Sequence, residues 1–126
     1  MSQVPDLLKY TKDHEWLLAA ADGTATIGIT DYAQTSLGDV TFAELPAVGA
    51  HLDEGQSLGV VESVKAASDV YMPLAGTVLE ANAAIGDDPS LINSDPFGKG
   101  FLIKVKLDNP ADAAKLLTAA EYRALV

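Results

Sequence analysis

The chain has 126 residues, with 18 acidic and 8 basic side chains, a net charge of −10 and no cysteine. Its length is typical of one domain over residues 1–126, and the 48% of apolar residues suffice for a core without covalent cross-links. The missing cysteines exclude disulfides, thiolate zinc sites and a cysteine nucleophile, while the acidic balance disfavours nucleic acids and anionic membrane surfaces as partners.

The chain begins with a predicted strand pair. Residues 16–20 form a short apolar strand, and Asp22-Gly23 supply the turn of a hairpin. Residues 24–29 are rich in β-branched side chains and predict the second strand. No apolar run approaches the roughly 20 residues of a membrane span, and residues 1–10 lack the features of a secretory signal.

A short helix and a further strand are expected next. Thr30 is placed to cap a helix over residues 31–37, which Gly38 would end. Val40 and Phe42 alternate with polar neighbours, and this period of two is typical of a strand.

The middle of the chain predicts a second hairpin. Residues 57–63 and 67–72 form its arms, and Val64-Lys65-Ala66 form the short connection between them. Lys65 is therefore expected at or beside the hairpin tip.

The last third alternates strands, a loop and helices. Its predicted elements are a strand at 77–80, a loop at 82–100 with one helical turn near 89–92, a strand at 101–107, a helix at 110–117 and a short final helix after a Thr118/Glu121 capping box. Together these elements predict a small, mainly-β sandwich or flattened barrel with one early helix and a C-terminal helical tail.

Signatures of an enzyme are weak in this sequence. The two histidines, His14 and His51, lie far apart, and no G-x-S-x-G elbow or phosphate-binding loop frame is present. We expect a surface or structural role for His14 and a solvated turn position for His51. No catalytic residue and no metal site is predicted.

Lys65 is singled out by the distribution of charge. Between Asp13 and Gly98 it is the only basic residue among 14 acids, which include Glu62 and Asp69. One hypothesis is a solvated turn residue with acidic neighbours. The other is a modification site, because an acylated lysine loses its charge and becomes a flexible tether for a cofactor.

The segment Gly59-Val60-Val61-Glu62-Ser63-Val64-Lys65-Ala66-Ala67-Ser68-Asp69-Val70-Tyr71 resembles the lipoyl-attachment segment of glycine cleavage H proteins. Further matches to this family cover nearly the whole chain. They are Tyr10 to Trp16, Ile27 to Gln34, Leu37 to Asp39, Phe42 to Pro46, Asn93 to Gly98 and the C-terminal tail.

The resemblance implies a lipoyl-domain fold, a flattened β-barrel or barrel-sandwich hybrid with added helices. It implies a carrier rather than an enzyme, with lipoate held on Lys65 through an amide. The implied partners are glycine decarboxylase (P protein), aminomethyltransferase (T protein), dihydrolipoamide dehydrogenase (L protein) and a lipoate-attaching enzyme. The arm would pass the aminomethyl group of glycine from the P protein to the T protein, and the L protein would reoxidise it.

The resemblance also assigns residues. The lipoylation motif comprises Glu62, Ser63, Val64, Ala66 and Asp69 around Lys65, and the candidate arm-docking residues are Glu15, Ile29 and Ser36. Acids such as Glu15 and Asp69 are candidates to shield the loaded group. The chain departs from common family choices at Ser36, where some members have a bulkier group, and at Phe101, where tryptophan is frequent.

Three alternatives stay open at this point. The chain could be a lipoyl domain of a 2-oxo acid dehydrogenase system, a biotin carrier, or a relay that donates lipoyl groups to other proteins. The first usually has Asp-Lys-Ala and the second Met-Lys-Met, whereas here the motif is Val64-Lys65-Ala66. We expect a cytoplasmic bacterial monomer, or a mitochondrial matrix protein if a transit peptide has been removed.

Overall fold

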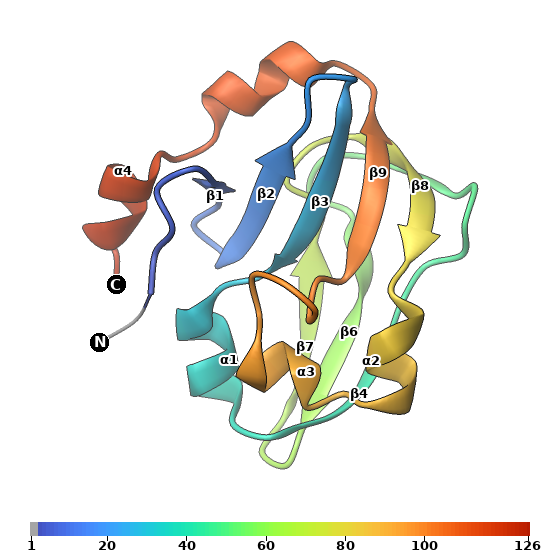
Figure 1. Cartoon of the computed structure of the whole chain (residues 1–126), viewed down its shortest axis with the longest axis vertical. Helices are drawn as coiled ribbons and strands as arrows, with labels where there is room; N and C mark the ends of the chain where they lie inside the picture. The colour runs from blue at the N-terminus through green and yellow to red at the C-terminus, as the bar shows by residue number, and fades with distance from the viewer. Residues whose placement is uncertain (1–2) are drawn as a thin grey trace.

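The computed structural model describes residues 3–126 and consists of two packed antiparallel sheets with helices around them (Figure 1). The larger sheet has the strand order β1-β2-β3-β9-β8-β5, and the smaller sheet has the order β4-β6-β7. The strands are β1 Lys9–Tyr10, β2 Glu15–Ala19, β3 Thr24–Ile29, β4 Val40–Glu44, β5 His51–Leu52, β6 Ser57–Ser63, β7 Ala67–Tyr71, β8 Gly76–Ala81 and β9 Ile103–Leu107.

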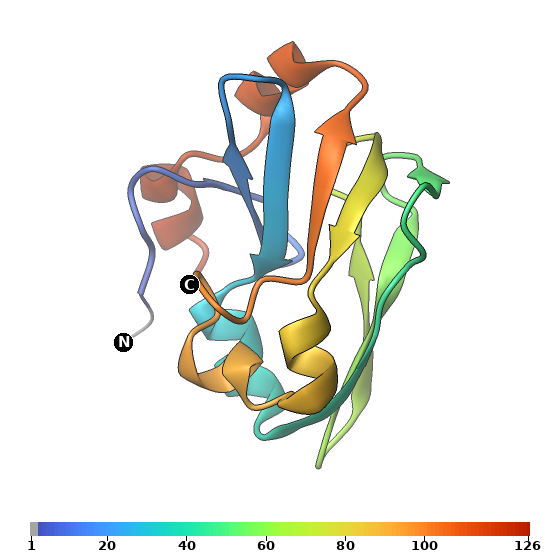
Figure 2. The same ribbon diagram turned by 45° about the vertical axis from the view of Figure 1, so that its right-hand side comes forward.

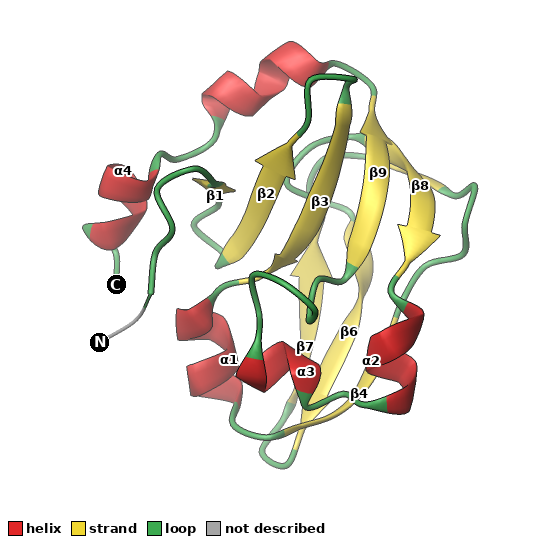
Figure 3. Ribbon diagram, in the orientation of Figure 1, coloured by secondary structure: helices red, strands yellow, loops and turns green. Residues whose placement is uncertain are grey.

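The helices lie at the ends and edges of the sheets rather than across their faces (Figures 2 and 3). They are α1 Asp31–Leu37, α2 Ala83–Asp87, α3 Leu91–Ser94, the 3₁₀ helix η1 Pro110–Lys115 and α4 Ala119–Arg123. Helices α1, α2 and α3 gather at the end of the sandwich near the β6–β7 turn, while α4 lies beside β1 near both termini (Figure 1). Among residues 3–126, no helix is long and apolar enough to cross a bilayer.

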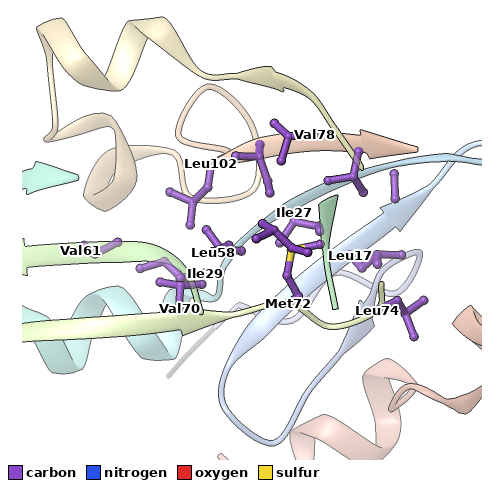
Figure 4. Packing of buried hydrophobic residues seen from close by; sticks show 14 of the residues in the cluster. Leu17, Ile27, Ile29, Leu58, Val61, Val70, Met72, Leu74, Val78 and Leu102 are labelled. Atoms are coloured by element: carbon purple, nitrogen blue, oxygen red, sulfur yellow. The ribbon is translucent and has the colours of Figure 1, made fainter. Parts of the chain in front are cut away.

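The main core lies between the two sheets (Figure 4). Ile27 of β3 and Val105 of β9 face Val61 of β6 and Val70 of β7, and all four are at most 3% exposed. A second, smaller cluster joins β1 and β2 to α4 through Tyr10, Trp16 and Tyr122. Burial of apolar surface contributes about 25 cal/mol per Å², so the main cluster holds the sheets together and the smaller one fixes the tail.

Several sequence predictions are confirmed. The mainly-β class, the two-sheet arrangement, the early helix and the helical tail are all present. Thr30 caps α1 by accepting a hydrogen bond from the Ala33 amide, and Gly38 ends the helix with φ at 79°. The capping box at Thr118 and Glu121 is formed at the start of α4.

Other predictions of element type and length were wrong. The helical turn expected near residues 89–92 is present as α3, but the segment 82–100 also contains α2, which Asn82 caps by accepting a bond from the Ala84 amide. The segment predicted as an α-helix at 110–117 is a 3₁₀ helix over Pro110–Lys115, and the last strand begins at Ile103 rather than at residue 101. The two-residue strands β1 and β5 were not predicted, since strands so short carry no periodic signal.

Phe42 departs from the period of two predicted for its strand. Simple alternation would bury it with Val40, yet Val40 is 6% exposed and Phe42 is 52% exposed. The register of β4 on β6 shifts between these two residues. A bulge inserts one extra residue and turns the following side chains to the other face, which leaves Phe42 on the surface.

Candidate functional site

Lys65 lies at the tip of the hairpin formed by β6 and β7, with Glu62 paired to Ala67 as the last register pair before the turn. The Ser63 amide donates to the Ala66 carbonyl at 2.8 Å. The Ser63 hydroxyl oxygen accepts hydrogen bonds from the Lys65 and Ala66 amides, each at 3.2 Å. Ser63 therefore fixes the turn from which the lysine projects.

The hairpin tip is also held by the segment that follows α1. The Val64 amide donates to the Asp39 carbonyl at 3.1 Å. A Cβ placed on Gly38 would lie 3.5 Å from Cε of Lys65, so the lysine stem runs close beside this glycine. The outer part of the lysine stem thus lies beside the end of α1, and the residue as a whole is exposed.

Asn93 of α3 holds in place the segment around Gly38 that lies beside the Lys65 stem. Its Nδ2 donates to the Gly38 carbonyl and to Oε1 of Gln34, both at 2.9 Å. Its Oδ1 accepts from the Val40 amide, also at 2.9 Å. One side chain thereby joins α1, β4 and α3 directly behind the lysine stem.

The acids that flank Lys65 in sequence do not pair with it. Among residues 3–126, the lysine ammonium forms no ion pair within 4.0 Å. Asp69 instead accepts a hydrogen bond from the Ser57 hydroxyl at 3.1 Å. Within the described residues, no acidic side chain therefore holds the ammonium group in place.

A narrow cleft of about 190 Å³ lies between α1 and β7. This is room for a slender group rather than a drug-sized ligand. The cleft is lined by Asp13, His14, Glu15, Ile29, Tyr32, Ala33, Ser36, Leu37, Ser68, Asp69 and Val70. Leu37, one of these residues, directly precedes Gly38, the glycine beside the Lys65 stem.

The structure brings together the predicted residues Glu15, Ile29, Ser36 and Asp69 in this one cleft. The other lining residues were missed by the sequence analysis. The α1 members, Tyr32, Ala33, Ser36 and Leu37, recur at the spacing of one helix face. Because Ser36 was already a candidate, this helical spacing could have predicted Tyr32, Ala33 and Leu37 as further lining residues.

Glu15 provides a buried carboxyl group in the cleft wall. It is 3% exposed, and its Oε1 accepts from the Thr11 hydroxyl at 2.6 Å while Oε2 accepts from the Tyr71 amide at 3.3 Å. Burial raises the pKa of this carboxyl, and the two hydrogen bonds oppose that shift. With Asp13 and Asp69 it makes a cleft that has three carboxyl groups and no lysine or arginine in its lining.

The two histidines differ in their surroundings. His14 has φ at 70° and packs against Tyr32, with ring centroids 4.5 Å apart and planes tilted by 33°. Its Nδ1 lies 2.7 Å from the Tyr122 hydroxyl. Burial lowers its pKa, which favours the neutral ring at neutral pH. His51 lies in β5 rather than in the predicted turn, and its Nε2 is 2.6 Å from Oδ2 of Asp108.

A larger cleft of about 310 Å³ lies at the other end of the β6–β7 hairpin, beside Tyr71, Met72 and Pro73. It is far along the hairpin from Lys65, although Asp13 and Glu15 contribute to both clefts. Among residues 3–126, no group of three histidine or acidic side chains is arranged to hold a metal ion.

The chain is similar to known proteins over nearly its whole length. Residues 8–126 match the family described as "Glycine cleavage H-protein". The chain is 58% identical to the glycine cleavage system H protein of Opitutus terrae over 100% of this chain and 99% of the relative. It is 50% identical to that of Cronobacter sakazakii over 100% of this chain and 98% of the relative.

A solved structure agrees with these sequence matches. The fold resembles the crystal structure of a glycine cleavage system H protein from Mycobacterium marinum with a TM-score of 0.88 and 41% identity. The match covers 96% of this chain and 97% of that chain.

Proposed function

This chain belongs to the glycine cleavage H-protein family, and from that premise we propose that it is a lipoyl carrier with lipoate joined to Lys65 through an amide. The observation that carries the proposal is the position of Lys65. It is an exposed lysine on a turn fixed by Ser63, and its stem lies beside Gly38, which directly follows Leu37 in the wall of a narrow cleft.

The residues present fit such a group. An amide at Nζ removes the positive charge, and since no ion pair of Lys65 is formed among residues 3–126, none is lost. The paired strands hold the lysine base while the four-carbon stem stays flexible. A lipoate-attaching enzyme would recognise the surface around Lys65, which is formed by Glu62, Ser63, Val64, Ala66 and Asp69.

Lipoate, when bound, supplies a reducible disulfide whose sulfurs can carry a one-carbon amine fragment derived from glycine. The protein contributes position and surroundings. We propose that the cleft lined by Glu15, Ile29, Ser36 and Asp69 receives the end of the arm. Three carboxyl groups in its wall favour a cationic amine over a neutral one, and the apolar Ile29 and Val70 side chains limit the access of water.

The proposed partners are the other glycine cleavage components: glycine decarboxylase, aminomethyltransferase and dihydrolipoamide dehydrogenase. Those enzymes would perform the chemistry, and this chain would act as a non-catalytic carrier and as one lipoyl-binding domain over residues 1–126. The bacterial origin of its relatives supports a place in the bacterial cytoplasm. Tethering raises the effective concentration of the carried group at each partner.

Intact mass tests the attachment. Incubation with lipoate, ATP and a lipoate-attaching enzyme should add one lipoyl group to the wild type and none to Lys65→Arg. Lys99→Arg is the matched control, since Lys99 is also an exposed loop lysine. Addition to Lys65→Arg at the wild-type rate would refute Lys65 as the attachment site.

Turnover tests the role in glycine cleavage. The lipoylated chain should support glycine-dependent reduction of NAD⁺ when the three partner enzymes and tetrahydrofolate, as acceptor of the one-carbon group, are added, and Lys65→Arg should not. A lipoylated chain that is inactive with glycine but donates lipoyl groups to other proteins would point to the relay role instead.

Ammonia release tests the cleft. After loading from glycine, Glu15→Gln and Asp69→Asn should release ammonia faster than the wild type, because each removes a carboxylate that stabilises the amine as a cation. Glu80→Gln on β8 is the matched control, since Glu80 lies outside the cleft. Equal release rates in all four proteins would contradict the assigned role of the cleft.

A further inference from the structure

A chain of hydrogen bonds links the C-terminal helix α4 to the wall of the cleft. The Tyr122 hydroxyl lies 2.7 Å from Oγ1 of Thr30 and 2.7 Å from Nδ1 of His14. The Tyr122 ring stacks on Tyr10 with centroids 4.6 Å apart and planes within 6°. Because both tyrosines are fully buried, the position of the hydroxyl group is fixed by packing.

The proton positions along this chain follow from what each group can donate. Thr30 is fully buried, and its oxygen already accepts from the Ala33 amide. Its own proton therefore needs an acceptor, and among residues 3–126 its other hydrogen-bond partner is the Tyr122 oxygen. A buried hydroxyl without an acceptor is rare and costly, so Thr30 donates to Tyr122.

The direction of that bond determines the tautomer of His14. Since Tyr122 accepts from Thr30, its single proton is free to be donated to Nδ1 of His14. A neutral imidazole that accepts at Nδ1 carries its proton on Nε2. The neutral form is the relevant one, because burial lowers the His14 pKa.

The proton on Nε2 of His14 has no hydrogen-bond partner within the described residues, 3–126. In that part of the chain, every side-chain nitrogen and oxygen that is shut off from solvent has a hydrogen-bond partner. Nε2 is therefore open to solvent. His14 lines the cleft, and its ring is held between Tyr32 and Tyr122.

Building on the proposed function, we propose that Tyr122 is a positioning residue that holds His14 as the Nε2–H tautomer. His14 then presents an N–H donor to the sulfur-bearing end of an arm on Lys65. Sulfur accepts such a bond weakly as a thiol or thioether, and more strongly when it carries negative charge.

The Nε2–H tautomer makes His14 a hydrogen-bond donor in a cleft whose carboxyl groups are acceptors. Asp13, Glu15 and Asp69 are acceptors and suit a cationic amine. With its proton on Nδ1, His14 would offer a lone pair to the same amine and would duplicate these carboxyl groups. With its proton on Nε2 it complements them, because it offers the donor that sulfur needs.

Nitrogen-15 NMR of the unmodified chain tests the first step without any cofactor. The histidine ring shifts should identify Nε2–H in the wild type and a mixture of tautomers in Tyr122→Phe, which keeps the ring stack. Tyr10→Phe is the matched control: it removes a hydroxyl from the same stack, one that donates to the Pro5 carbonyl instead, and should leave the tautomer unchanged. Nδ1–H in the wild type, or no change in Tyr122→Phe, would overturn the inference.

Proton exchange in the lipoylated chain tests the second step. Lipoylation should slow exchange of the His14 Nε2 proton with water by about twofold, as expected for one hydrogen bond at the weak end of the usual net strength. The slowing should shrink in Tyr122→Phe and persist in Tyr10→Phe. Equal exchange with and without the arm would overturn the donor role, whereas a chain that takes no lipoyl group at Lys65 would instead overturn the proposed function.

Discussion

Asn93 offers the sharpest test of how the lysine tip is supported. Asn93→Ala removes three hydrogen bonds of 2.9 Å, to the Val40 amide, the Gly38 carbonyl and Gln34. Val40 is 6% exposed, so its amide would be left without a partner. A buried unsatisfied donor costs about 1–3 kcal/mol. Gly38 is partly exposed, so its carbonyl can bind water instead.

We expect Asn93→Ala to lower the free energy of unfolding by about 2–4 kcal/mol, since the lost bonds add to the stranded amide. Urea unfolding followed by Trp16 fluorescence measures this, because the chain has one tryptophan and it is 1% exposed. Lipoylation of Lys65 should also slow, since Gly38 beside its stem would lose its anchor.

The control for this substitution is Asn109→Ala. Asn109 makes one exposed side-chain bond of 3.3 Å to Asp112, so its loss should change stability by less than about 0.5 kcal/mol. A loss below about 1 kcal/mol in Asn93→Ala, or equal losses in the two variants, would refute the reasoning that Asn93 supports the tip.

Two further predictions concern packing and pH. Gly28→Ala should destabilise by about 1–3 kcal/mol, because its Cβ would lie 2.6 Å from the buried Trp16 ring. Gly86→Ala, with open space around it, should instead stabilise by about 0.4–1 kcal/mol; similar unfolding midpoints would contradict both. Two effects of Asp108 raise the pKa of His51: the hydrogen bond between them, which is the larger effect, and the negative charge of the carboxylate. Asp108→Asn should therefore lower that pKa in an NMR titration. Below about pH 6.5, the free energy of unfolding should be higher for the wild type than for Asp108→Asn. This difference should disappear as the pH rises through the pKa of His51 in the folded state; a pH-independent difference would contradict the pairing.

The sequence by itself determined the elements that have strong local signals. The hairpin with Lys65 at its tip follows from two apolar β-rich runs around a three-residue connection. Helix α1 follows from Thr30 and Gly38, whose capping roles depend only on their neighbours along the chain. The family resemblance rests on the same local segments, so it does not depend on how they pack against one another.

Weak local signals left the rest open to error. Phe42 moved to the surface because a bulge depends on the pairing of β4 with β6, which no single strand encodes. The residues 110–115 adopted a 3₁₀ rather than an α-helical path, a difference of one residue in hydrogen-bond spacing that sequence patterns do not separate.

Only the tertiary structure decided how the site is assembled. Glu15, Ser36 and Asp69 are far apart in sequence and meet in one cleft because β2, α1 and β7 each contribute to its wall. The contact of Gly38 with the Lys65 stem, its support by Asn93, and the link from Tyr122 to His14 each join segments at least 27 residues apart, as residues 38 and 65 illustrate. The sequence singles out Lys65 as the one lysine in an acidic stretch, but the surroundings of that lysine exist only once distant segments have packed together.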